Sequence, residues 1–286
     1  MTEPKHHHYV PRFYLSRFTD PTKKLWVFDK LTDKIFSSTP ENVGGQNQFY
    51  RLDELTKDGI DALELEKQFA DLEYQVSNIT NNWLQQFTHT KTLTIPDINR
   101  DLISLFITTQ LLRTVEAREQ LVQFTSLTQK GYDARSDAKN LQAAFLWDDD
   151  FVNKMKQRIS SCIWIFGINE SSVPFCTSDH PVLIKTQDNK QWLLGPRIFD
   201  KGMYIVYPLS PTLIMYCKDP DGWSVLKRFE NSLSPVEFTD DMVQHENSGQ
   251  IGMSYRFIFS MENNFKFANN FLSENKEFKN PERERY

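Results

Sequence analysis

Cysteine and glycine are scarce in this sequence, which has 3 Cys and 10 Gly among 286 residues. The cysteines, Cys162, Cys176 and Cys217, are widely spaced and form no Cys-x-x-Cys pair. This spacing argues against a disulfide framework and against a structural zinc site. Each cysteine lies in an apolar, strand-like run, so we expect all three to pack as small hydrophobic side chains.

The sequence also lacks a long apolar run, a targeting segment and an excess of positive charge. No run of about 18 apolar residues could cross a bilayer, and no secretory signal opens the chain. A net charge of −5 argues against broad, non-specific binding to nucleic acid or to anionic membranes. We therefore expect a cytoplasmic protein with no membrane partner.

Several familiar active-site motifs are absent as well. There is no P-loop, no Gly-x-Gly-x-x-Gly fingerprint and no His-Glu-x-x-His zinc motif. The Gly-x-Ser-x-Gly elbow of serine hydrolases is missing too, so a serine nucleophile is not expected. Any catalytic site must therefore be assembled from residues outside these motifs.

What the chain does contain is largely apolar and aromatic. Hydrophobic residues make up 39% of it and aromatic residues 13%, with 22 Phe and 6 Trp. This composition predicts a folded protein with a core rich in aromatic rings. Because no linker interrupts it, we expect residues 1–286 to form a single α+β domain. Its parts are a docked segment, a hairpin and helices over 1–160, a mainly β region with one late helix over 161–272, and a charged tail over 273–286 that frays.

The periodicity of the apolar residues predicts where these elements lie. Spacings of three and four residues predict helices over 59–87, 96–130, 138–158 and 239–255. The run Asp148-Asp149-Asp150 is expected to interrupt the third of these and to cap its second part. Short β-type runs predict a hairpin over 24–36 and strands over 162–166, 174–177, 182–184, 191–194, 203–207, 213–217 and 257–260. The expected fold is a helical N-terminal half packed on an antiparallel β-sheet from the C-terminal half.

The first candidate functional feature is the N-terminal segment over 5–18. Three consecutive histidines, His6 to His8, precede an apolar run that is too large to be left in water, so we expect the segment to dock. Three histidines are also what an affinity tag leaves behind, but this run leads straight into the docked segment, which favours native sequence. Only one or two of the three side chains can point inward, and we expect His8 to do so first and His7 second.

The second candidate is a buried guanidinium group. Residues 102–112 are apolar on nearly every side of the predicted helix, and Gln110 and Arg113 continue its buried stripe. Because an unpaired buried guanidinium is costly, Arg113 requires a carboxylate, a cluster of carbonyls or an anionic ligand. A structural ion pair and a ligand are both open, and the candidate carboxylates on the preceding helix are Glu64, Glu66 and Glu73.

The third candidate is the polar turn over 177–181, which joins two apolar runs at the edge of a predicted sheet. Ser178 and Asp179 can satisfy the backbone of this turn and do nothing else. The functional interpretation makes Asp179 a general base, a metal ligand or the group that orients His8.

Four blocks of the sequence resemble a known family. They are His7-His8-Tyr9-Val10-Pro11-Arg12-Phe13-Tyr14-Leu15, Gln110-Leu111-Leu112-Arg113, Thr177-Ser178-Asp179-His180-Pro181-Val182 and Pro208-Leu209-Ser210-Pro211. In this order they are similar to the domain-of-unknown-function family numbered 4238, which commonly has Gln at Arg12 and Asn at His180. The resemblance carries no established reaction. It implies one site formed by the first three blocks, with the residues His8, Gln110, Arg113, Ser178 and Asp179.

The mixture of imidazole, guanidinium, amide and carboxylate groups favours an enzyme that handles an anion. We expect a hydrolase, foremost a nuclease or phosphodiesterase serving as a toxin or defence effector, whose partner is nucleic acid or a nucleotide. His8 is then the general acid or base, and Asp179 orients it or binds a divalent ion such as Mg²⁺ or Mn²⁺. Gln110 and Arg113 hold a phosphate. The residues expected to bind substrate are His7, Ser178, Asn247 and Gln250.

Two alternatives are open. Cleavage of the N-glycosidic bond of a nucleotide such as NAD would use amides and a carboxylate in place of a metal. A non-catalytic module would bind a nucleotide or a partner protein without turnover. The negative net charge favours a small ligand over a long nucleic acid.

Overall fold

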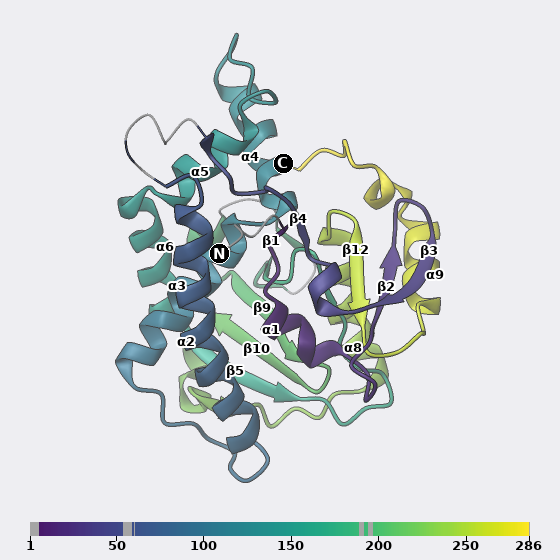
Figure 1. Ribbon diagram of the computed structural model, residues 1–286. Helices are drawn as coiled ribbons and strands as arrows, with labels where there is room; N and C mark the ends of the chain where they lie inside the picture. The colour runs from purple at the N-terminus through teal and green to yellow at the C-terminus, as the bar shows by residue number, and fades with distance from the viewer. Residues whose placement is uncertain (1–5, 54–58, 60, 189–191, 194–196, 286) are drawn as a thin grey trace.

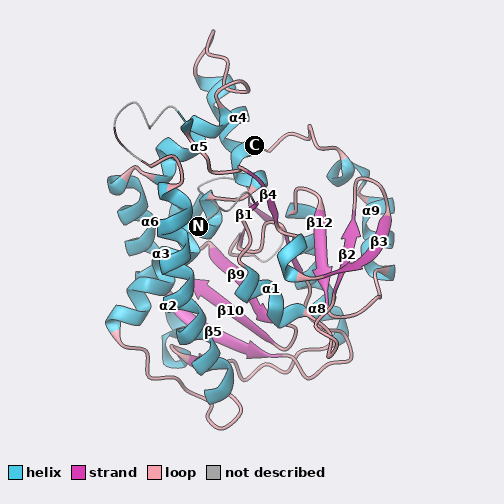
Figure 2. Cartoon of the chain, in the orientation of Figure 1, coloured by secondary structure: helices cyan, strands magenta, loops and turns pink. Residues whose placement is uncertain are grey.

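The structure is a computed structural model that describes residues 6–53, 59, 61–188, 192–193 and 197–285. Helices lie against a six-stranded sheet, and a smaller four-stranded sheet stands beside it (Figures 1 and 2). The protein is of the mixed α+β class. The expected single sheet from the C-terminal half differs from what the described chain forms, because the smaller sheet takes strands from both halves. None of the described helices combines the length and the apolar character needed to span a bilayer.

The larger sheet has the strand order β11-β5-β10-β9-β7-β8. All but two residues of its three longest strands are buried, which explains their nearly continuous apolar sequence. Neighbouring strands are antiparallel except β11 and β5, which are parallel. The strands are β5 (Ile163–Ile168), β7 (Leu183–Lys185), β8 (Trp192–Leu193), β9 (Tyr204–Ser210), β10 (Leu213–Lys218) and β11 (Ser232–Leu233).

Helices cover both faces of this sheet. On one face, α2 (Glu64–Gln86) crosses in front of the strands in Figure 1, and the ring of its Trp83 lies 5.5 Å from that of Phe166 on β5. Behind α2, α3 (Asp97–Leu112) packs against α6 (Asp149–Ser161). On the other face, Val243 of α8 (Asp240–Met253) joins an apolar cluster with residues of β9 and β10. These rings and aliphatic side chains give the aromatic core that the composition predicts.

The smaller sheet joins the two ends of the chain. Its order is β3-β2-β12-β6, and the predicted hairpin is confirmed as its β2 and β3 pair. Because β12 lies between the hairpin and β6, a C-terminal strand fixes the polar turn to the N-terminal part. The strands are β2 (Leu25–Asp29), β3 (Lys34–Ser38), β6 (Thr177–Ser178) and β12 (Phe257–Ser260), and α9 (Lys266–Glu274) packs beside them.

The N-terminal segment docks as expected. Its strand β1 (His6–His8) pairs with β4 (Gly45–Asn47), and α1 (Arg12–Leu15) follows near the centre of Figure 1. Its apolar side chains are buried or half-buried, and the fully buried ones include Val10, Tyr14 and Phe18. Lys5 lies outside the described residues.

Three predicted helices are confirmed, and one is wrong. Helix α2 matches the first, although Ile60 lies outside the described residues, and α8 matches the last. The third divides into α5 (Ala138–Leu146) and α6, with the Asp148 carboxylate accepting from the Phe151 amide at 2.9 Å. The second does not run through to residue 130.

That second helix is broken between Leu112 and Val115. Helix α3 ends at Leu112, and α4 (Val115–Thr128) begins after Thr114, whose hydroxyl accepts a hydrogen bond from the Ala117 amide at 3.2 Å. A threonine hydroxyl in this position starts a new helix by satisfying one of its free amides. Arg113 therefore sits at a turn between two helices rather than within one.

The C-terminal tail is docked, so the expectation that it frays is wrong. Arg285 donates from Nε and Nη2 to the two carboxylate oxygens of Glu116 on α4, at 2.8 and 3.1 Å. Arg283 reaches the same carboxylate at 2.9 Å. All three side chains are buried, and a buried carboxylate needs such counter-charges to offset its lost hydration.

The first prediction follows from the ion cluster of Glu116, Arg283 and Arg285. The substitution Glu116→Gln leaves two buried guanidinium groups without their carboxylate, and should lower the free energy of unfolding by about 3 kcal/mol or more in urea denaturation. The control Glu282→Gln removes an exposed carboxylate of the same tail and should change stability by no more than about 0.5 kcal/mol. Equal effects of the two substitutions would show that the tail does not contribute through this cluster.

Candidate functional site

The sequence blocks meet at the break between α3 and α4. Gln110, in the last turn of α3, donates from Nε2 to the Tyr9 carbonyl at 2.8 Å, which ties this helix to the N-terminal block. Thr114, directly after the break, places its hydroxyl 2.7 Å from Nδ1 of buried His180 in the polar turn. Burial lowers the pKa of His180 to about 4, so at neutral pH it is an uncharged hydrogen-bonding partner.

Tyr14 connects the remaining blocks. Its hydroxyl donates to the Pro208 carbonyl at 2.7 Å and lies 2.7 Å from the Thr177 hydroxyl. Since the single phenolic proton goes to Pro208, the Thr177 hydroxyl donates to Tyr14. Buried hydrogen bonds of Gln110, Thr114 and Tyr14 thus join four segments that are far apart in the sequence.

Arg113, at the break between α3 and α4, is a charged residue that is only 1% exposed. Its Nε donates to Gln110 Oε1 at 2.9 Å, and its Nη1 donates to Glu73 Oε1 on α2 at 2.8 Å. The guanidinium also lies over the rings of Phe69 and Phe106, at 5.1 and 5.9 Å. Of the three candidate carboxylates, Glu73 is the one that pairs with Arg113. The buried Nη2 has no hydrogen-bond partner, so one donor is left over.

Glu66 lies two helical turns before Glu73, on the same face of α2, and belongs to the same cluster. Its side chain is half-buried, and its Oε2 is a buried atom without a hydrogen-bond partner. Burial and the neighbouring Glu73 charge raise the pKa of Glu66 to about 7, while the charges of Arg113 and Arg12 oppose the rise. Glu66 can therefore gain or lose a proton near neutral pH. Arg12 itself is exposed, and the Glu73 side chain is 23% exposed, so solvent reaches the edge of this cluster.

The histidines divide between the two faces of β1. His7 is fully buried, and its Nδ1 accepts from the Tyr50 amide at 3.0 Å, so the expectation that His8 points inward first is wrong. Alternation along the strand puts His6 and His8 together on the opposite face, with their rings 4.9 Å apart. Burial, His6 and Arg12 lower the pKa of His8 to about 4, and its Nε2 is buried without a partner.

Asp179 is used by the backbone of the smaller sheet. Its carboxylate accepts hydrogen bonds from the amides of Tyr255, Arg256 and Phe257 at 2.7 to 2.8 Å. Burial raises its pKa, while these amides and the nearby Lys30 ammonium oppose the rise. His8 is not among these partners, and the carboxylate clamps the entry to β12.

The other predicted binding residues also hold the chain together. Ser178 donates to Gln250 Oε1 at 2.8 Å, and Gln250 Nε2 donates to the Pro181 carbonyl at 2.9 Å. Asn247 accepts from the Cys176 amide at 2.9 Å and donates to the Pro174 carbonyl at 3.0 Å. Through these contacts, the polar side chains of α8 hold the polar turn and the segment that leads into it.

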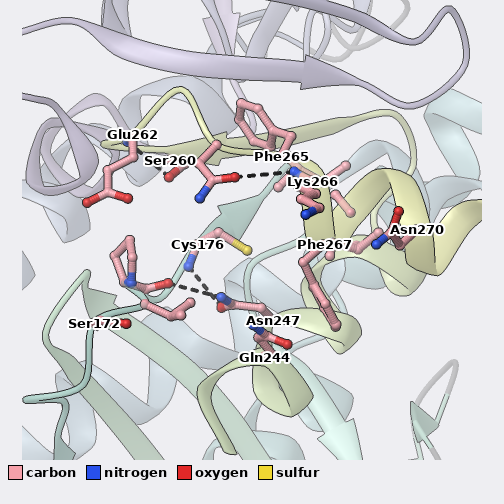
Figure 3. Close-up of a pocket in the computed structure, with 16 residues that line it drawn as sticks. Ser172, Cys176, Gln244, Asn247, Ser260, Glu262, Phe265, Lys266, Phe267 and Asn270 are labelled. Atoms are coloured by element: carbon pink, nitrogen blue, oxygen red, sulfur yellow. Dashed lines mark hydrogen bonds between the residues drawn. The ribbon is translucent and has the colours of Figure 1, made fainter. Parts of the chain in front are cut away.

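Asn247 also borders a cavity of about 340 Å³ between α8, β12 and α9 (Figure 3). The view shows its amide bound to the cavity wall, while Lys266, Glu262 and Asn270 rim the space. This cavity is formed by residues of the segments 172–176, 244–258 and 260–270, and none of the Arg113 cluster lines it. The fold thus separates the predicted residue Asn247 from Gln110 and Arg113.

The predicted residues therefore fall into separate groups. Gln110 and Arg113 lie together, whereas Ser178 and Asp179 serve the turn and His8 faces the other side of β1. The sequence analysis named Glu66 and Glu73 only as possible partners of Arg113 and left them out of the predicted site residues. The sequence pattern that indicates them is their seven-residue separation, which puts both side chains on one face of a helix. In the described part of the chain no group of three or more His, Cys, Asp or Glu side chains is placed to hold a metal ion.

The unusual state of Glu66 makes the second prediction. Because its pKa rises from the ordinary 4.5 to about 7 on folding, the folded state binds the proton more tightly, and stability is lost as pH rises through that window. The variant Glu66→Gln cannot lose a proton. The difference in the free energy of unfolding, variant minus wild type, should therefore be more positive at pH 7.5 than at pH 5. Urea denaturation at both values measures this difference, and Glu64→Gln in the same helical turn is the control. An equal difference at both pH values would contradict the assignment.

Comparisons with known proteins place the chain in a family. Neither the curated proteins nor the solved structures contain a match. The family model described as a protein of unknown function, DUF4238, matches residues 6–264. The match covers most of the chain, including all four sequence blocks, and the protein therefore belongs to the DUF4238 family.

Proposed function

We propose that the protein is a cytoplasmic hydrolase that acts on a phosphate-containing nucleotide or nucleic acid, in the first place as a nuclease or phosphodiesterase and as a toxin or defence effector. One observation carries the proposal. A carboxyl group that titrates near neutrality, on Glu66, and a fixed guanidinium, on Arg113, share one cluster and each keep a buried polar atom without a partner. Buried polar atoms are rarely left unpaired unless water or a ligand completes them.

The charge of the cluster favours an anionic substrate. Arg113 and Arg12 contribute two positive charges, and Glu73 contributes one negative charge through its ion pair. With Glu66 protonated, these three side chains together carry one positive charge. Arg17 adds another cation further along α2, where it binds Thr80 and Asn81. A phosphate group would satisfy the free Nη2 donor of Arg113 and the excess charge together.

In the proposed reaction, Arg113 and Arg12 hold the phosphate oxygens while water attacks phosphorus. The phosphorus–oxygen ester bond breaks, and Glu66 gives its proton to the departing oxygen. The attacking water releases a proton to solvent, and Glu66 takes one up from solvent before the next turnover. This assignment moves the acid role from His8 to Glu66, because a group whose pKa lies near the working pH transfers protons best. His8 is uncharged at neutral pH and takes no part in this proton transfer.

A second candidate reaction is cleavage of a nucleotide N-glycosidic bond, as in NAD consumption. The observation that favours it is the pair of carboxyl groups, Glu66 and Glu73, in different environments. One is raised in pKa by burial, and the other is paired with Arg113. Two carboxyl groups with divided acid and base roles are typical of glycosidic bond hydrolysis.

The third prediction tests this function with labelled RNA, single- and double-stranded DNA and NAD. Each is incubated with Mg²⁺, with Mn²⁺ and with EDTA. Wild type should cleave at least one substrate, Glu66→Gln should lose about 100-fold or more of the rate, and the matched control Glu64→Gln should retain it. With Glu66 as the acid, the rate should fall as pH rises above about 7, where Glu66 loses its proton.

The products distinguish the alternatives. Shortened nucleic acid supports the phosphodiesterase, and free nicotinamide with intact nucleic acid supports the glycosidic reaction. Stoichiometric binding without turnover would instead identify a non-catalytic module. If Glu66→Gln and Arg113→Lys both keep the full wild-type rate, the proposed site is wrong.

A further inference from the structure

A cavity of about 310 Å³ lies against the far face of the larger sheet, away from the Arg113 cluster. Its floor is formed by residues of β9 and β10, and its walls come from α7 (Pro220–Trp223), the 3₁₀ helix over Ser224–Phe229 and α8. The lining is mostly apolar, with two charged groups, Lys218 and Glu246. Val236 and Met242 at its rim are 51% and 38% exposed, so the cavity opens to solvent.

Lys218 stands among aromatic rings. Its Nζ lies 3.6 Å from the ring centre of Tyr204, 3.9 Å from that of Trp223 and 5.3 Å from that of Tyr216. These faces stabilise the ammonium group by cation–π attraction. Across the described residues, no carboxylate lies within ion-pair distance of Lys218.

The Glu246 carboxylate, which also lines the cavity, forms its ion pair with another lysine, although its Oε2 has no hydrogen-bond partner. Glu246 lies 3.5 Å from Nζ of Lys185, a side chain on β7 that is 0% exposed, and its other oxygen accepts from the Tyr216 hydroxyl at 3.3 Å. Lys185 also approaches Nε2 of His245 at 2.6 Å. The Glu246 charge thus acts on two ammonium groups, but only Lys185 is within ion-pair distance of it.

We propose that this cavity binds an amphiphilic carboxylate, whose anionic group pairs with Lys218 and whose hydrocarbon body lies along the apolar walls. The geometry suits this class of ligand because Lys218 lies on β10 at the floor of the cavity, while the apolar residues Val236 and Met242, which also line it, are exposed to solvent. A carboxylate at Lys218 would supply the ion-pair partner that this ammonium group lacks among the described residues. The apolar body would cover surface that is otherwise exposed to water.

The electrostatics of Lys218 support the same conclusion. Burial and the Lys185 charge lower its pKa to about 8, whereas the Glu246 charge opposes this. A lowered pKa in an ammonium group means that its charge is under-compensated. A neutral ligand of equal size would bury the same apolar surface without correcting this, so charge should separate the two in affinity.

The fourth prediction uses octanoate and its neutral counterpart octanamide as probes, with titration calorimetry at pH 7. Octanoate should bind the wild-type protein more tightly than octanamide. Lys218→Met, which keeps the length and apolar bulk of the side chain, should weaken octanoate binding about 10-fold or more and leave octanamide unchanged. Lys227→Met, on the exposed side of the neighbouring 3₁₀ helix, is the matched control and should bind both probes as wild type does.

Each other outcome overturns the proposal. Equal affinity of wild type for the two probes would make the cavity a simple apolar groove, and the absence of octanoate binding would exclude the ligand class. Unchanged octanoate binding by Lys218→Met would exclude the role of Lys218. An unchanged melting temperature and near-UV spectrum of Lys218→Met establish that it is folded.

Discussion

Burial of the Arg113 guanidinium is the constraint on which this architecture depends. A charge at 1% exposure has to be matched by fixed partners, and here they come from two helices, through Gln110 and Glu73. These contacts link α2 to the end of α3. The break after Arg113 then places Thr114 against His180, so the polar turn is positioned by the same feature. The contacts at this break therefore contribute both to the packing of the helices and to the candidate site.

The sequence blocks of the family have two physical roles that the sequence does not separate. Asp179 accepts three backbone amides, and Ser178 and Gln250 fasten the turn to α8, so these polar residues stabilise the union of the two sheets. Arg113 and Glu66 instead each keep a buried polar atom without a hydrogen-bond partner. Satisfied groups indicate architecture and unsatisfied ones indicate chemistry. On that criterion the turn supports the fold, and the α1–α2–α3 junction is the candidate site.

Local signals predicted much of the fold, and tertiary pairing explains what they missed. The hairpin, α2, α8 and the Asp148 cap follow from periodicity and capping chemistry within a few residues. The choice of Glu73 as the partner of Arg113 depends on how two helices cross, which no local pattern fixes. Docking of the tail likewise depends on Glu116, which is distant in sequence from Arg285. Of the predicted site, Gln110 and Arg113 lie together because Arg113 directly follows the last turn of α3, where Gln110 accepts its hydrogen bond.

Stability alone does not account for the α1–α2–α3 junction. An apolar residue at position 66 would bury its surface without the cost of a desolvated carboxyl group, and would leave Glu73 and Gln110 to neutralise Arg113. Instead, Glu66 is held where burial and the Glu73 charge raise its pKa, beside an exposed Arg12. Groups in such a costly arrangement are characteristic of sites where chemistry, rather than packing, determines the residue. The Lys30 ammonium, by contrast, is buried with three backbone carbonyls as acceptors, and a purely structural charge is satisfied in this way.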